Sequence, residues 1–167
     1  MTVDALVTLA SAARDLGLAA TAGGLLVVAG ILPASHAAAP RALLVARAGS
    51  ILWVIAALTH SLASYAVIRG DLPDASRFVE EWWSYSTSVD LLVAYLQVVG
   101  AGVVASVLCA LVRGPTAAAW SLVPLAWAIG WLAQTGHAAG AADHHLAVSA
   151  MVLHLVGAVV WTGVIGT

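Results

Sequence analysis

The sequence contains little charge and no lysine. Only 8% of its 167 residues are charged, and all six cations are arginines, whereas a soluble domain usually carries about 25% charged residues. The formal net charge is −2 and no basic run is present, which excludes a typical nucleic-acid-binding surface. The single cysteine, Cys109, excludes an internal disulfide and a CxxC metal or redox motif. No GxSxG, HExxH, P-loop or Rossmann fingerprint occurs, so we predict that the chain is not an enzyme.

Hydrophobic residues make up 62% of the chain, so its main solvent is predicted to be the lipid bilayer. The pattern predicts an all-α integral membrane protein, in which residues 1–167 form a single transmembrane domain. A spanning helix needs about 20 apolar residues, and five stretches qualify. A short amphipathic lead, residues 2–15, precedes the first of them. The predicted helices cover about 16–34, 42–68, 89–112, 116–136 and 145–167.

The longest connection, residues 69–88, differs in composition from the rest. It contains several carboxylates, two arginines and the pair Trp82-Trp83. Tryptophans beside carboxylates are typical of the boundary between lipid and water, so a short amphipathic helix is predicted to lie at that interface.

The charges also give an orientation. Arg41, Arg47 and Arg113 stand without carboxylates, so their side is predicted to be cytoplasmic and the N-terminus to lie outside the inner membrane. An alternative is that residues 16–32 are a signal peptide, because small residues follow them. The last helix has no polar flank, which predicts that the chain is a fragment of a longer protein.

Histidines are the main functional signal, since ionisable side chains inside membranes are costly and often functional. His60 and His154 fall within predicted helices at similar depth, and His137, His144 and His145 cluster in the connection before the last helix. Imidazoles are good ligands for copper or zinc, so all five are candidate metal ligands. The alternative is that they only form structural hydrogen bonds.

Two further residues are candidate supports for such a site. Asp90 is placed to orient a histidine, or simply to favour the start of its helix. Met151 lies one turn from His154 and offers a thioether for Cu(I). Small residues around His154 predict that it points into the bundle, whereas Val152, Val156 and Val159 would then face lipid. The small residues share one helical face: Ala147, Ala150, Gly157, Ala158, with Trp161 beside them.

The last two helices resemble the copper-resistance D (CopD-like) membrane protein family. The stretches that carry the resemblance are Gly136-His137-Ala138-Ala139, Leu153-His154-Leu155 and Trp161-Thr162-Gly163. The earlier part, from Gly17 to Pro33 and at Asp71-Leu72-Pro73, is similar to the N-terminal part of actinobacterial chains that join this domain to a cytochrome-oxidase copper-assembly domain. The family domain continues further, and Val164 replaces the second glycine of its Trp-x-Gly-Gly pattern. The resemblance implies copper handling, with His137 and His154 as the matched residues.

Three functional hypotheses remain open from the sequence. The first is copper transport or delivery by exchange between histidine ligands. The second is a non-enzymatic accessory or assembly subunit of a larger membrane complex, such as a respiratory oxidase. The third is a b-type haem protein with His60 and His154 as axial ligands.

Overall fold

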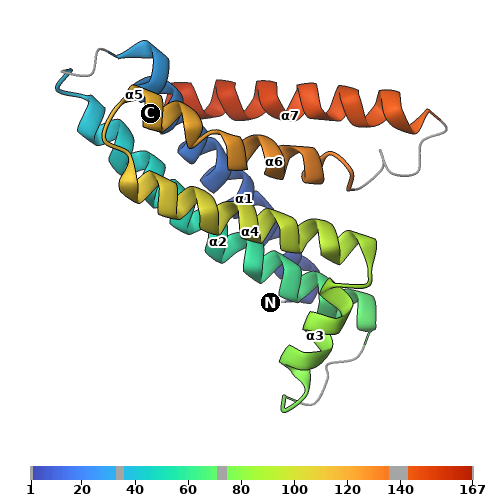
Figure 1. The fold of residues 1–167 in the computed structure, drawn as a ribbon. Coiled ribbons are helices and arrows are strands. Elements are labelled where there is room, and N and C mark those ends of the chain that lie inside the picture. The colour runs from blue at the N-terminus through green and yellow to red at the C-terminus, as the bar shows by residue number, and fades with distance from the viewer. Residues whose placement is uncertain (1, 33–35, 71–74, 136–142, 167) are drawn as a thin grey trace.

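The chain is helical throughout the part that the structure describes. The computed structural model describes residues 2–32, 36–70, 75–135 and 143–166, the side chain of His144 excepted, and contains no strand within these ranges. The elements, drawn in Figure 1, are α1 (Val3–Leu26), η1 (Val27–Ile31), α2 (Ala39–Arg69), α3 (Phe78–Ser86), α4 (Asp90–Leu111), α5 (Pro115–Trp120), α6 (Val123–Leu132) and α7 (His144–Gly166). The predicted all-α class is confirmed.

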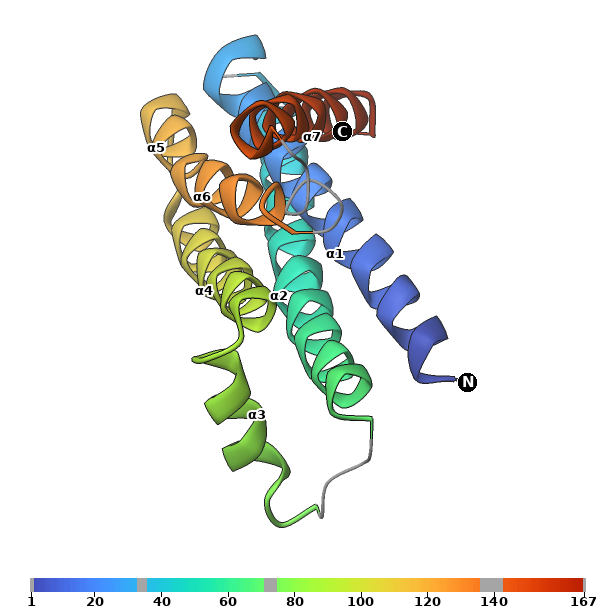
Figure 2. The same ribbon diagram turned by 90° about the vertical axis from the view of Figure 1, so that its right-hand side faces the viewer.

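Four helical stretches are long and apolar enough to cross a membrane: Val3–Ile31, Ala39–Arg69, Asp90–Leu111 and His145–Gly166. Their outer faces keep large apolar side chains exposed, for example Leu44 and Ile55 on α2. Such surfaces suit lipid rather than water. Helices α1, α2 and α4 run alongside one another, whereas α7 crosses α1 at an angle (Figures 1 and 2). The chain is therefore an all-α membrane bundle.

The first helix begins at Val3, so the prediction of a separate amphipathic lead over residues 2–15 is wrong. The Thr2 hydroxyl caps the helix by accepting a hydrogen bond from the Ala5 N–H at 3.3 Å. The helix then continues without a break through Arg14 and into the π-helical turn η1. Arg14 consequently lies about 17 Å along the spanning stretch from Val3, deep within it.

The predicted fourth helix, residues 116–136, is interrupted. The chain forms two short helices, α5 and α6, separated by a turn at Ser121 and Leu122. Pro124 stands in the first turn of α6. Proline has no N–H to donate and its ring clashes with the preceding turn, so α5 cannot continue through it. Neither α5 nor α6 is among the four stretches that are long enough to span a membrane alone.

Helices α1 and α2 approach each other closely where glycines face one another. A Cβ built on Gly17 would lie 2.8 Å from the Gly49 carbonyl oxygen, and one built on Gly49 would lie 2.9 Å from the Gly17 carbonyl oxygen. Any larger residue at either position would push the backbones apart. This close approach lets short-range polar contacts form between the two helices further along the same interface.

The predicted short helix in the long connection is present as α3, and Glu81 holds it against the end of α2. The Tyr65 hydroxyl donates to Glu81 Oε2 at 3.1 Å, and Arg69 pairs with the same oxygen at 2.9 Å. In addition, Trp82 Nε1 donates to the Ser61 hydroxyl at 3.2 Å. Helix α3 is therefore fixed by specific polar contacts, while its place at the lipid–water interface stays a prediction.

Replacing Glu81 with alanine is expected to lower the free energy of unfolding by about 1–3 kcal/mol, because it leaves the buried Tyr65 hydroxyl and the Arg69 guanidinium without their acceptor. Denaturant unfolding of the detergent-purified protein measures this. Glu80→Ala is the matched control, since Glu80 is an exposed carboxylate on the same helix. Equal losses in the two variants would contradict the role given to Glu81.

Helix α7 meets α1 at a second pair of glycines. A Cβ built on Gly163 would collide with the Ala19 carbonyl oxygen, and one built on Gly23 would collide with the Gly163 backbone. Gly163→Leu is expected to displace α7 and to lower the melting temperature by several degrees. Gly157→Leu, at a position with open space around it on the same helix, is the control and should melt like the parent protein. A parent-like melting temperature for Gly163→Leu would show that the two helices do not pack as described.

Candidate functional site

A buried polar contact joins α1 to α2 in the middle of the bundle. Arg14 and His60 are 8% and 5% exposed, and Nη1 of the arginine lies 3.2 Å from Nδ1 of the histidine. His60 is about 14 Å from the end of α2, and Arg14 is about 17 Å from the start of α1, so the two sit at matching depth in antiparallel neighbours. Charged groups at such depth are rare and mark functional sites by default.

The hydrogen bond determines which nitrogen of His60 carries its proton. A guanidinium has only donors, so Nη1 of Arg14 donates and Nδ1 of His60 accepts. The imidazole is then neutral, with its proton on Nε2. Arg14 thus favours the neutral form of His60, and its guanidinium engages the lone pair on Nδ1.

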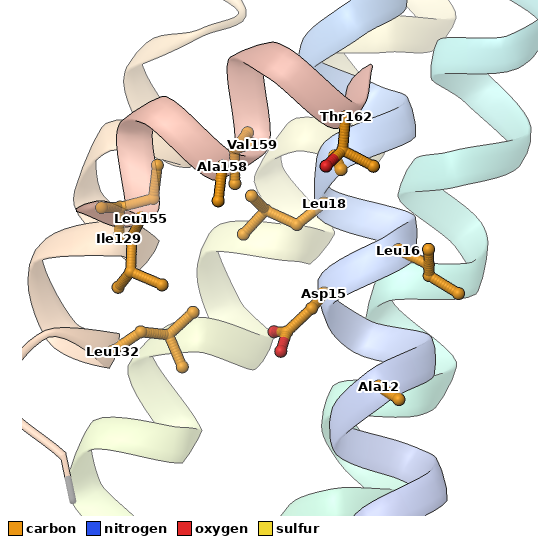
Figure 3. Close-up of a pocket in the computed structure, with 11 residues that line it drawn as sticks. Ala12, Asp15, Leu16, Leu18, Ile129, Leu132, Leu155, Ala158, Val159 and Thr162 are labelled. Atoms are coloured by element: carbon orange, nitrogen blue, oxygen red, sulfur yellow. The ribbon is translucent and has the colours of Figure 1, made fainter. Parts of the chain in front are cut away.

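Asp15 balances the charge of Arg14 and opens onto a cavity. Both Nε and Nη2 of Arg14 lie 2.9 Å from Asp15 Oδ1, and the carboxylate side chain is 55% exposed. It lines a cavity of about 310 Å³ enclosed by α1, α6 and α7. Figure 3 shows this carboxylate among mostly apolar walls that include Leu18, Leu132 and Leu155, with Thr162 as the other polar side chain. Asp15 therefore contacts the buried Arg14 on one side and faces the cavity on the other.

Tyr95 of α4 closes the other side of the site. Its ring packs edge-on against the His60 ring, with centroids 4.5 Å apart. Tyr95 also lines a second cavity of about 340 Å³, at the end of the bundle where α1 begins, α2 ends and α4 begins. Asp4, Thr8 and Ser64 make that cavity partly polar. His60 thus lies between a partly polar cavity and the arginine.

The predicted inward orientation of His154 is wrong. His154 is exposed, and α7 packs through the opposite side, where Val152, Leu155 and Val159 lie against the core. These large side chains and Gly163 fit the surfaces of α1 and α6, so most of the small-residue face is left outside, and Ala158 lines the cavity between the three helices. The residues of that face that are exposed are Ala150, Gly157, Ala158 and Trp161. The structure does not bring His154 and His60 together, either as copper ligands or as axial ligands of a haem.

The remaining predicted ligands belong to the connection before α7. His137 lies outside the described residues, and His144 begins α7 with its side chain outside the description. His145 is exposed in the first turn of α7. Among the residues that the structure describes, no three histidine, cysteine, aspartate or glutamate side chains gather into a possible metal site. Metal binding by this connection stays a prediction.

The two predicted supporting residues lie apart from His60. Asp90 is exposed in the first turn of α4, where a carboxylate is favoured by the helix dipole. Met151 is half-buried on α7. Within the described chain, the groups around His60 are instead Arg14, Asp15 and Tyr95, which sequence reasoning did not assign to a site. The signal that could have found them is an arginine inside an apolar helix, once that helix is known to begin at Val3.

His60→Ala is expected to destabilise the protein by about 1–3 kcal/mol, because it removes the acceptor of a buried guanidinium hydrogen bond. His154→Ala is the matched control, since it removes an exposed imidazole from another helix and should change stability by less than about 0.5 kcal/mol. Denaturant unfolding in detergent compares the two. A larger loss for His154→Ala would mean that α7 turns its histidine inward after all.

Comparison of the chain with family models, with curated proteins and with solved structures found no match. The resemblance to the copper-resistance D family accordingly stays a prediction, carried by short motifs around His137, His154 and Trp161.

Proposed function

We propose that the protein transports or delivers copper across or within the cytoplasmic membrane by exchange between ligands, with its N-terminus outside. The observation that carries this proposal is His60, a buried imidazole whose unprotonated Nδ1 lies deep in the bundle, where it accepts a hydrogen bond from Arg14. Neutral imidazole is a common copper ligand. A carboxylate lies nearby, because Arg14 hydrogen-bonds both His60 and Asp15. Ligand exchange requires no nucleophile and no general acid or base.

The resemblance of the last two helices supports copper as the cargo, and the histidine-rich connection supports a point of entry. His137, His144 and His145 would receive the ion before it moves to His60. His154 has no part in this route, because it is exposed on the outer face of α7. Its exposed position suits contact with another membrane helix instead.

A second candidate function is favoured by the surface of α7. Its exposed face carries Ala150 and Gly157 around His154, and small residues let another helix pack closely in a membrane. The chain would then be an accessory or assembly subunit of a larger membrane complex, such as a respiratory oxidase. Stable co-purification with such a complex, without bound copper, would favour this candidate over copper handling.

The copper proposal predicts that the detergent-purified protein binds about one Cu(I) and that His60→Ala weakens this binding by about tenfold or more, since one ligand is lost. Competition with a chromophoric Cu(I) chelator measures the affinity. His36→Ala is the control, because His36 is exposed in the turn before α2 and caps only the local backbone. Absence of copper binding, or equal affinity in all three proteins, would remove the copper role of His60.

A further inference from the structure

Two exposed arginines, Arg47 and Arg113, lie at the end of the bundle where α2 begins and α4 ends (Figure 1). Residues 16–70 and 91–142, which include this end of both helices, contain no aspartate and no glutamate. In the part of the chain that the structure describes, neither arginine forms an ion pair, whereas Arg14, Arg69 and Arg77 each face a carboxylate. The protein therefore supplies no counter-ion for these two guanidinium groups.

The side chain of Arg47 is fixed at the last turn of α4. Its Nε donates to the Cys109 carbonyl oxygen at 3.1 Å, and that carbonyl is one of the last four of the helix, which have no intrahelical donor. Both Nη groups of Arg47 are left without a hydrogen bond to any described residue. Arg113 follows Cys109 by four residues, so its backbone is at most about 14 Å from the same carbonyl. Two long cationic side chains thus start from neighbouring points and have donors to spare.

The depth of these arginines matches the level of phospholipid headgroups. Helix α4 has 22 residues, or about 33 Å, which is close to the roughly 30 Å of the hydrocarbon layer. The Cys109 carbonyl is about 3 Å inside the end of α4, and Arg113 lies two residues beyond that end. Arginines near the end of a spanning helix extend their charged tips into the headgroup layer. The anions available at that level are lipid phosphates.

We infer that Arg47 and Arg113 together bind the headgroup phosphate of an anionic phospholipid at this end of the bundle. A guanidinium donates two parallel hydrogen bonds to a phosphate, and Arg47 has both Nη groups available for this. Two unbalanced positive charges favour a lipid with a net negative charge over a zwitterionic one, whose own ammonium they would repel. Arg41, in the first turn of α2, adds to the positive potential of the same end. The inference is independent of the proposed copper function.

The test is a lipid titration of the full chain in detergent, followed by native mass spectrometry, with phosphatidylglycerol, phosphatidylethanolamine and soluble glycerol 3-phosphate. The parent is expected to bind phosphatidylglycerol about tenfold more tightly than phosphatidylethanolamine, and to bind no glycerol 3-phosphate at the same concentration. The variant Arg47→Gln/Arg113→Gln is expected to bind phosphatidylglycerol about tenfold more weakly than the parent; a glutamine amide at 47 still offers a donor to the end of α4. Arg77→Gln is the matched control, because it removes an equal charge from an exposed arginine at the other end of the bundle.

Four results would overturn the inference. Equal affinity of the parent for the two phospholipids would mean that the site does not select a negative headgroup, and equal affinity for glycerol 3-phosphate would mean that it takes a soluble anion. Unchanged affinity in the double variant would remove both arginines from lipid binding. An equal loss in Arg77→Gln would reduce the effect to net charge. Should the double variant not fold, Arg113→Gln alone decides the question, because Arg113 is exposed and lies outside the helices: a loss of about threefold is expected, and unchanged affinity overturns the inference.

Discussion

The hydrogen bond between Arg14 and His60 constrains the rest of the bundle, because a guanidinium cannot be buried in a membrane protein without acceptors and a counter-ion. Its acceptor comes from another helix, so α1 and α2 must stay close and in register. The facing glycines at positions 17 and 49 allow that approach. The counter-ion comes from the adjacent residue, Asp15, which keeps the pair neutral whatever the neighbouring helices do. Packing and charge balance therefore support the same contact.

Long apolar runs made most of the fold predictable. Helices α2, α4 and α7 begin and end within about three residues of their predicted bounds, since the length of a spanning helix is set by the bilayer. Two of the helix predictions are wrong, that of a separate lead over residues 2–15 and that of an uninterrupted helix over residues 116–136, and each has one cause. A hydropathy pattern counts Arg14 and Asp15 as two separate charges and therefore ends the apolar helix before them. In the structure the two residues form an ion pair, and α1 runs through both. Pro124 lies inside a strongly apolar stretch, so a hydropathy pattern alone does not show that α5 cannot continue through it.

The candidate site was harder to predict than the helices. The burial of His60 follows from the small residues Ser61 and Ser64 beside it, which are buried as well. Its partners could not be predicted, because the contact depends on how far α1 is shifted along α2, and a shift of one turn would separate Arg14 from His60 by about 5 Å. On α7 the small residues around His154 are predicted to face the bundle, but the opposite side of the helix packs against it. There a single close contact at Gly163 sets the approach, and Leu155 and Val159 fill the space beside it.

Charge conservation at the buried site narrows the kind of ion that the proposed exchange can carry. With a neutral imidazole, Arg14 and Asp15 sum to zero, and the low dielectric of the surroundings penalises any departure from that sum. An ion that binds there adds its own charge to that sum, so the electrostatic penalty rises with the charge of the ion. Cu(I) would add one positive charge, whereas Cu(II) would add two. If copper is the cargo, charge alone therefore favours the cuprous ion at this depth.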